Sequence, residues 1–404
     1  MTVAVISEPR VRVPMQVPMS SPDVHEGDIA AVQAVLGSTS LSLGPRVVEF
    51  EAAVARTADV AHGVAVSSGT AGLHLCVIAA GVTEGDLVIT TPFSFVASAN
   101  VMLYERAVPV FVDVDPVTGN IDPAQVAAAV RDLDAGGERA RRWLPPRLRS
   151  AQPGRLKALL PVHVFGQPAD MDALLAVARA YNLSVIEDAC EAIGAEYNGR
   201  RVGGLGDAGV FAFYPNKQMT TGEGGMIVTD RDDWDALGRS LRNQGRDVFD
   251  AWLSHTRLGY NYRLDEMSAA LGTSQCARLD RLLDNRARVA ASYAELLAGI
   301  PGIVVPAVCP STTRMSWFVY VVQVGAPLTR DTVMAGLAAQ GVPSRPYFTP
   351  IHLQTFYAER FGYARGDFPV TEALGDACLA LPFSGVMTRD QVEHVCATIR
   401  DLLP

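Results

Sequence analysis

The chain has 404 residues, of which 49% are hydrophobic and 19% are charged, and its formal net charge is −9. This length allows two or three domains with a large buried core, and the composition is that of a soluble globular protein. The acidic balance argues against general nucleic-acid binding, which needs a basic surface, but it does not exclude one anionic ligand in a local pocket.

No apolar run approaches the roughly 18 residues that a membrane span requires. The N-terminus lacks the charged start and long apolar core of a signal peptide. We therefore expect a cytoplasmic protein that does not interact with a membrane. The six cysteines show no Cys-x-x-Cys pair, so they are expected to be buried thiols, and no metal is expected.

The first elements predict a loose arm over residues 1–13, a helix near residues 29–36 and a second helix after a turn at residues 40–45. Residues 64–75 then predict a short strand, a tight turn at Ser68-Gly69-Thr70 and a helix that contains His74, which is expected to be a packed or a surface histidine. The first amides of a helix and the positive end of its dipole favour anions. The turn is therefore either a phosphate site or a plain helix cap.

Further strands are expected at residues 86–92 and 109–115, and the first of them leads into a helix that begins near Phe93. Residues 132–157 are rich in arginine, and a solvated surface loop is favoured there over a nucleotide contact. The next buried strand ends near His163, a weak candidate for a supporting role.

Two segments further along the chain carry the chemistry. A strand over residues 183–188 ends in Glu187 and Asp188, and ligands of parallel α/β sheets bind where strands end. Lys217 stands between an apolar strand and a Gly-rich turn, and a partly desolvated lysine is a usable nucleophile. A surface lysine on a hairpin is the alternative. Together, a lysine that holds an aldehyde and a carboxylate that keeps a pyridine nitrogen protonated suit pyridoxal phosphate.

The motifs are Glu187-Asp188-Ala-Cys190-Glu191-Ala, Phe211-Ala-Phe-Tyr-Pro-Asn-Lys217 and Thr221-Gly-Glu-Gly-Gly225. They resemble the active-site motifs of the DegT/DnrJ/EryC1/StrS aminotransferases, and the resemblance runs from about Pro14 to the C-terminus. It implies an aspartate aminotransferase-like (fold type I) α/β fold, with a large cofactor domain over residues 14–277. A smaller α+β domain is implied over residues 278–404, with a strand near 315–324, a helix at 331–340 and a final helix at 389–403. The resemblance also marks residues 132–157 as a basic surface insertion in the large domain.

The resemblance also implies the roles of individual residues. Lys217 holds pyridoxal 5'-phosphate, Asp188 bonds its ring nitrogen, Phe95 stacks on the ring, and Ser68, Gly69 and Thr70 take the phosphate. Asn261 is expected to reach the cofactor phosphate of a second subunit, which implies a homodimer with shared active sites. Substrate contacts are carried over to Arg263, His352, Tyr214 and Ser42.

The implied reaction moves an amino group from L-glutamate to a keto-sugar nucleotide. The segments near Arg246 and Asn261 resemble those of perosamine-type family members, which implies 4-keto-6-deoxy sugars as substrates. Family members that dehydrate sugars carry histidine in place of the lysine, so Lys217 speaks against that reaction. Amination of cyclitols or other keto substrates stays open, as does a regulatory protein that binds the cofactor without turnover.

The chain departs from the family pattern at two positions. Ala212 replaces a serine that bonds the cofactor phosphate, so looser cofactor retention is expected unless Ser67, Ser68, Thr220 or the partner's Asn261 supplies that bond. Glu191 stands where histidine or glutamine is common and contacts the cofactor. How a carboxylate there changes the chemistry is left open, and Cys190 beside it is expected to pack.

Overall fold

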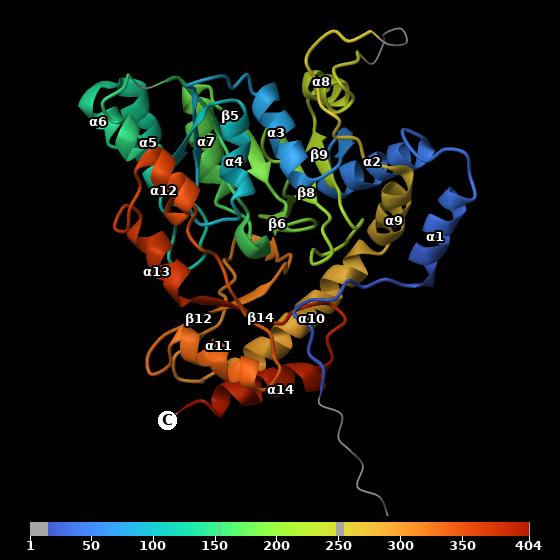
Figure 1. Ribbon diagram of the computed structural model, residues 1–404, viewed down its shortest axis with the longest axis vertical. Coiled ribbons are helices and arrows are strands. Elements are labelled where there is room, and N and C mark those ends of the chain that lie inside the picture. The colour runs from blue at the N-terminus through green and yellow to red at the C-terminus, as the bar shows by residue number, and fades with distance from the viewer. Residues whose placement is uncertain (1–14, 153, 248–253, 404) are drawn as a thin grey trace, which may run out of the picture.

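The computed structural model describes residues 15–152, 154–247 and 254–403. They form a larger unit around a central sheet and a smaller unit that lies below it in Figure 1. The arm expected at residues 1–13 lies outside the described residues. A long helix, α10 (Leu279–Leu297), leads from the larger unit into the smaller one.

The central sheet contains, in the described part of the chain, seven strands in the order β1-β9-β8-β5-β4-β2-β3. Strand β9 runs antiparallel to both of its neighbours, and the other adjacent pairs are parallel. The strands are β1 (His62–Val66), β2 (Leu87–Thr90), β3 (Val108–Phe111), β4 (Leu156–Leu159), β5 (Ser184–Asp188), β8 (Ala208–Ala212) and β9 (Gly225–Thr229). The α/β class with a mostly parallel sheet is confirmed.

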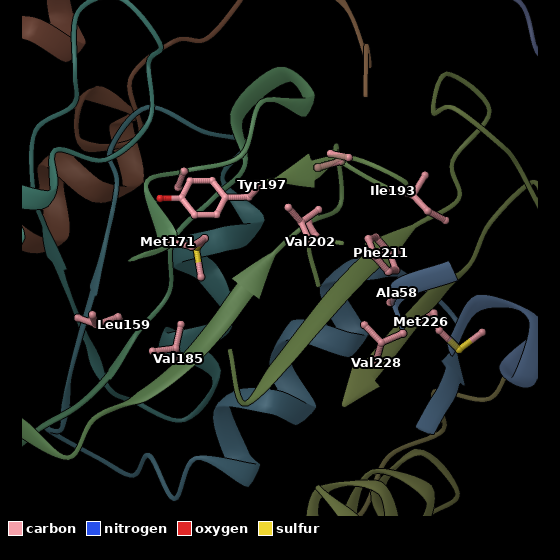
Figure 2. Packing of buried hydrophobic residues seen from close by; sticks show 14 of the residues in the cluster. Ala58, Leu159, Met171, Val185, Ile193, Tyr197, Val202, Phe211, Met226 and Val228 are labelled. Carbon is pink, nitrogen blue, oxygen red and sulfur yellow. The ribbon is translucent and has the colours of Figure 1, made fainter. Parts of the chain in front are cut away.

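Helices cover both faces of this sheet, because successive strand residues point to opposite sides. Val185 packs into the core of one face, drawn in Figure 2, and Ile186 packs into the core of the other. The first face carries α2 (Pro45–Ala58), α5 (Pro123–Ala135) and α7 (Met171–Tyr181). The second carries α3 (Gly69–Ala79), α4 (Ala97–Tyr104) and α8 (Asp232–Arg242). Helices α1 (Glu26–Leu36) and α9 (Glu266–Cys276) pack together beside α2.

The smaller unit has its own antiparallel sheet in the order β10-β12-β14-β13. Its elements are β10 (Ile303–Val304), β12 (Tyr320–Val324), α11 (Arg330–Ala339), β13 (Arg345–Pro346), β14 (Cys378–Leu381) and α14 (Arg389–Arg400). The expected last helix is confirmed as α14, which buries Val392, Val395 and Ile399. A separate small sheet joins β11 (Thr312–Arg314) to β6 (Glu196–Tyr197) and β7 (Arg200–Arg201) of the larger unit.

Two segments cross the boundary expected at residues 277 and 278. Near the start of the described chain, Val17 packs into the small core and the Met19 carbonyl accepts a bond from the Phe383 amide at 2.9 Å. In the other direction, η3 (Ile351–Leu353), α12 (Thr355–Phe361) and α13 (Pro369–Ala377) fold back onto the larger unit. There the Val370 and Thr371 amides donate to Asp113 at 3.0 and 2.8 Å.

The basic segment 132–157 is folded, which corrects the expectation of a solvated loop. It contains the end of α5, then α6 (Gly137–Arg141) and η1 (Pro146–Leu148), before β4 begins. Arg142 and the Trp143 indole both donate to the buried Asp132, at 2.6 and 3.0 Å, and Leu144 is buried. The arginines lie on the surface of this folded segment, so its basic composition misled the prediction about its backbone.

Glu187 ties the end of β5 to the turn that precedes β8. Its buried carboxylate accepts bonds from the amides of Gly203, Leu205 and Gly206 at 2.7–2.9 Å. It also lies 3.0 Å from Nε2 of the buried His163. Because His163 Nδ1 accepts the Ala169 amide, Nε2 carries the proton and donates to Glu187. His163 therefore supports the strand end and does not line the cavity described below.

Replacing Glu187 with alanine is expected to lower the free energy of unfolding by about 3–5 kcal/mol, because buried donors lose their acceptor. Urea denaturation of the purified chain measures this loss. Glu295→Ala is the control, since Glu295 makes an exposed pair with Arg389 on the surface and such pairs contribute little. Equal unfolding midpoints for the two variants would contradict the role given to Glu187.

Candidate active site

Lys217 projects from the turn after β8 into a partly enclosed environment. Its amide bonds the Tyr214 carbonyl at 2.9 Å, and its side chain is 13% exposed. The amine Nζ lies 3.8 Å from the centroid of the Phe318 ring and 3.8 Å from Glu191 Oε1. The Lys217 side chain therefore lies beside an aromatic ring and is mostly enclosed, unlike a lysine on an exposed hairpin.

Asp188 ends strand β5 and is almost fully buried. The Ser98 hydroxyl donates to its Oδ2 at 2.7 Å, and the Cys190 amide donates to its Oδ1 at 3.2 Å. These two bonds fix the orientation of the carboxylate. Ser98 was not identified from the sequence, although it follows Ser94 at helical spacing in the segment that opens α4.

Helix α3 begins beside these groups, and the free amides of a helix start suit an anion. Ser68 caps the helix by accepting the Ala71 amide at 3.1 Å, and the first amides of a helix have no partner within it. A Cβ at Gly69 would lie 2.7 Å from Cys190 Sγ and 2.8 Å from Ala212 Cβ, so glycine is required for this close approach. The tight turn therefore brings the amides of the helix start up against the cavity.

One cavity of about 420 Å³ collects most of the residues that the sequence singled out. The predicted residues that line it are Ser68, Gly69, Thr70, Phe95, Asp188, Glu191, Tyr214 and Lys217. Phe318, Tyr347 and Phe348 complete one wall from the C-terminal part of the chain, and sequence patterns gave no signal for them. The size is in the range of ordinary small-molecule sites.

The residues present suit pyridoxal phosphate. An amine, a carboxylate at a strand end, a helix start for a phosphate and the 62%-exposed Phe95 face one space. Ala212 lines the cavity without a hydroxyl, and the Thr220 hydroxyl is already donated to the Phe213 carbonyl at 2.9 Å. Of the substitutes considered for the missing serine, Ser68 is the one of this chain that lines the cavity.

Ser42, Asn261 and Arg263 do not line this cavity. Ser42 forms a β-bridge with Asp265, and Asn261 forms one with Asn243. Arg263 donates to the Asn243 side chain at 3.1 Å. These residues therefore gather around segment 258–265, where Ser42 and Asn261 are exposed. His74 holds this segment, since its Nδ1 lies 3.2 Å from the Tyr262 hydroxyl.

His352 lies in the core and not in the cavity, which corrects its expected approach to a sugar nucleotide. Its Nε2 lies 3.0 Å from Glu372 Oε1, and its ring packs 4.8 Å from Phe368. Burial lowers the pKa of His352, although Glu372 opposes this. The loop before it does reach the site, through Tyr347 and Phe348.

Burial also raises the pKa of two side chains next to Lys217. It raises the pKa of Glu191, while the Lys217 amine and the Phe165 amide, which donates to Oε2 at 2.9 Å, oppose the rise. Burial and the Asp188 charge raise the pKa of the Cys190 thiol well above its ordinary value. Cys190 is therefore a protonated packing residue at neutral pH.

Glu191→Gln is expected to gain stability relative to the wild type as the pH rises from about 5 to about 8. A carboxyl whose folded pKa is raised binds its proton more tightly in the folded protein. The resulting stabilisation is present below the unfolded pKa and is lost as the pH rises through the folded one. Urea midpoints of both proteins at the two pH values measure the difference. A difference that stays constant or shrinks would contradict the shift.

Known proteins are similar in sequence to most of this chain. The family model of the DegT/DnrJ/EryC1/StrS aminotransferase family matches residues 22–400. GDP-perosamine synthase of Caulobacter vibrioides is 40% identical over 364 residues, 90% of this chain and 91% of that protein. In the described part of the chain, no helix is both long and apolar enough to cross a membrane.

Two solved structures share the fold over nearly the whole chain. DesV of S. venezuelae, in complex with a ketimine intermediate, is 34% identical with a TM-score of 0.81 and covers 93% of each chain. DesI in the presence of its TDP-sugar product is 33% identical with a TM-score of 0.82, covering 96% of this chain and 92% of that one. The chain belongs to the DegT/DnrJ/EryC1/StrS aminotransferase family, whose members are pyridoxal-phosphate-dependent enzymes of fold type I.

Proposed function

We propose that the protein transfers an amino group from L-glutamate to a keto-sugar nucleotide of the 4-keto-6-deoxy type. The product is an amino-sugar nucleotide for polysaccharide or glycoside biosynthesis. The observation that carries this proposal is the meeting of the Lys217 amine and the Asp188 carboxylate in one cavity with a helix start. The likeness to GDP-perosamine synthase supports the substrate class.

The cofactor pyridoxal phosphate, when bound, supplies an aldehyde and an electron-accepting ring. Asp188, oriented by Ser98, holds the proton on the ring nitrogen by opposite charge. Ser68, Gly69 and Thr70 bind the phosphate with helix amides and a hydroxyl. Phe95 gives the ring a flat apolar neighbour that excludes water.

Lys217 has two tasks in this reaction. Its Nζ first holds the cofactor and, when freed, takes and returns the proton at the reacting carbon. Glu191, 3.8 Å from Nζ, is the nearby carboxylate that keeps the amine directed into the cavity.

The cavity also continues outward, which supports a substrate larger than an amino acid. Ser94, Phe95 and Phe348 line both the cavity and an open groove of about 740 Å³. Asn100, Gln354 and Arg360 line that groove as well. The groove has room for a nucleotide, and the DesI structure was solved with a TDP-sugar product.

A homodimer with shared active sites belongs to the same proposal. Asn261 is exposed and does not line the cavity of its own chain. Its surroundings carry exposed apolar side chains, among them Leu258 at 84% and Leu43 at 50%. Such a surface favours burial against a second copy, which would bring Asn261 and Arg263 to the partner's site.

Lys217→Ala is expected to abolish turnover of L-glutamate with a panel of 4-keto-6-deoxy sugars linked to GDP, TDP or UDP. The chain contains two lysines, so Lys157→Ala in β4 is a matched control that keeps its activity. Chromatography of the amino-sugar product measures turnover.

The outcome of that panel distinguishes a sugar aminotransferase from an aminotransferase for other ketones and from a regulatory protein. Appreciable turnover by Lys217→Ala would refute its role. Turnover of a cyclitol or another ketone, with none of the sugar nucleotides, would replace the proposed substrate class. Cofactor binding without any turnover would indicate a regulatory protein.

Mixing Lys217→Ala with Asn261→Asp is expected to restore up to about a quarter of the wild-type activity. Each variant alone is inactive, because one lacks the amine and the other places a negative charge against the cofactor phosphate. A mixed dimer contains one site with neither change. If native mass spectrometry shows mixed dimers without activity, the shared site is wrong.

A further inference from the structure

Arg286 occupies a core position of helix α10. The buried residues of this helix recur at helical spacing, and Arg286 falls among Leu282, Leu283 and Val289 with 3% exposure. No carboxylate of the described residues forms an ion pair with it. Burial lowers the pKa of its guanidinium to about 10, partly opposed by Asp23. A buried cation without an ion pair is costly, so its bonds must offset that cost.

The Arg286 guanidinium divides its bonds between two segments that lie far apart in the sequence. Nη2 donates to the carbonyls of Asn216 and Lys217, at 3.1 and 2.6 Å. Nη1 donates to the carbonyls of Trp317 and Phe318, at 3.3 and 3.1 Å. The planar fork thus spans the lysine turn of the larger unit and the segment that enters β12 of the smaller one.

The two segments are the ones whose side chains meet at the reactive amine. Lys217 Nζ stands 3.8 Å from the Phe318 ring, and Arg286 holds the backbone carbonyl of each of these residues. Gln218 also connects the two units. Its side-chain amide donates to the Glu191 carbonyl at 2.6 Å and to the Ser316 hydroxyl at 2.8 Å. The position of the amine therefore depends on contacts between the units, made by residues that do not line the cavity.

We propose that Arg286 is a positioning residue that holds the Lys217 amine over the Phe318 ring and directs it into the cavity. This inference rests on the proposed function. Arg286 does not line the cavity and acts through two backbone segments. Lysine at this position keeps the charge but offers one nitrogen, which cannot bridge both pairs of carbonyls.

The first test is the rate at which pyridoxal phosphate attaches to the full chain. Borohydride trapping and peptide mass mapping separate Lys217 from Lys157, which serves as an internal reference in every sample. Arg286→Met is expected to slow attachment at Lys217 at least tenfold, and Arg286→Lys to slow it less. Arg288→Met is the control, because Arg288 is an exposed arginine on the same helix.

A second readout follows the amine itself and does not need the cofactor. Carbon-13 methylation of the lysine amines gives an NMR signal for Lys217 that the Phe318 ring shifts upfield, and Phe318→Leu identifies it by removing the shift. Arg286→Lys, compared under conditions where urea titration shows it folded, is expected to lose most of this shift.

The outcomes separate this proposal from the one it rests on. Wild-type attachment rates in both Arg286 variants and an unchanged ring shift in Arg286→Lys would show that Arg286 only stabilises the fold. A wild-type chain that does not take pyridoxal phosphate at Lys217 would overturn the proposed function. The ring shift would still decide whether Arg286 positions the amine.

Discussion

Strand β5 ends in two adjacent carboxylates that the strand geometry turns to opposite faces of the sheet. Glu187 accepts bonds from the backbone amides of the turn before β8, whereas Asp188 lines the cavity. The first is a structural anchor and the second is the functional group. Successive strand residues alternate, so the bonds that Glu187 makes on one face hold the strand end from which Asp188 projects on the other.

The amine that faces Asp188 is positioned by residues from three parts of the chain. The turn after β8 supplies Lys217, the loop after β5 supplies Glu191, and the segment before β12 supplies Phe318. Arg286 and Gln218 connect these three segments by donating to their backbone carbonyls. A reactive group held in this way has little freedom to adopt other rotamers, which favours chemistry that needs a fixed proton acceptor.

The site residues that could be predicted from the sequence are those whose role is indicated by their immediate neighbours in the chain. Asp188 follows a run of strand residues, Lys217 precedes a Gly-rich turn, and Ser68 caps a helix. Phe318 and Arg286 were missed because their partners are about a hundred residues away or on another element. A signal did exist for Arg286, which interrupts the apolar stripe of α10. His352 was misjudged because a loop histidine gives no sign that it will be buried against Glu372.

The crossing of the chain between the two units has a mechanical consequence. Residues 17–19 reach down to the small core, residues 351–371 return to the large unit, and α10 runs between them. A hinge requires a few residues that absorb a rotation, and these crossings act as separate tethers that oppose one. These tethers therefore oppose a rotation of the smaller unit relative to the larger one. Residues of both units line the cavity, so these tethers also hold its opposite walls together.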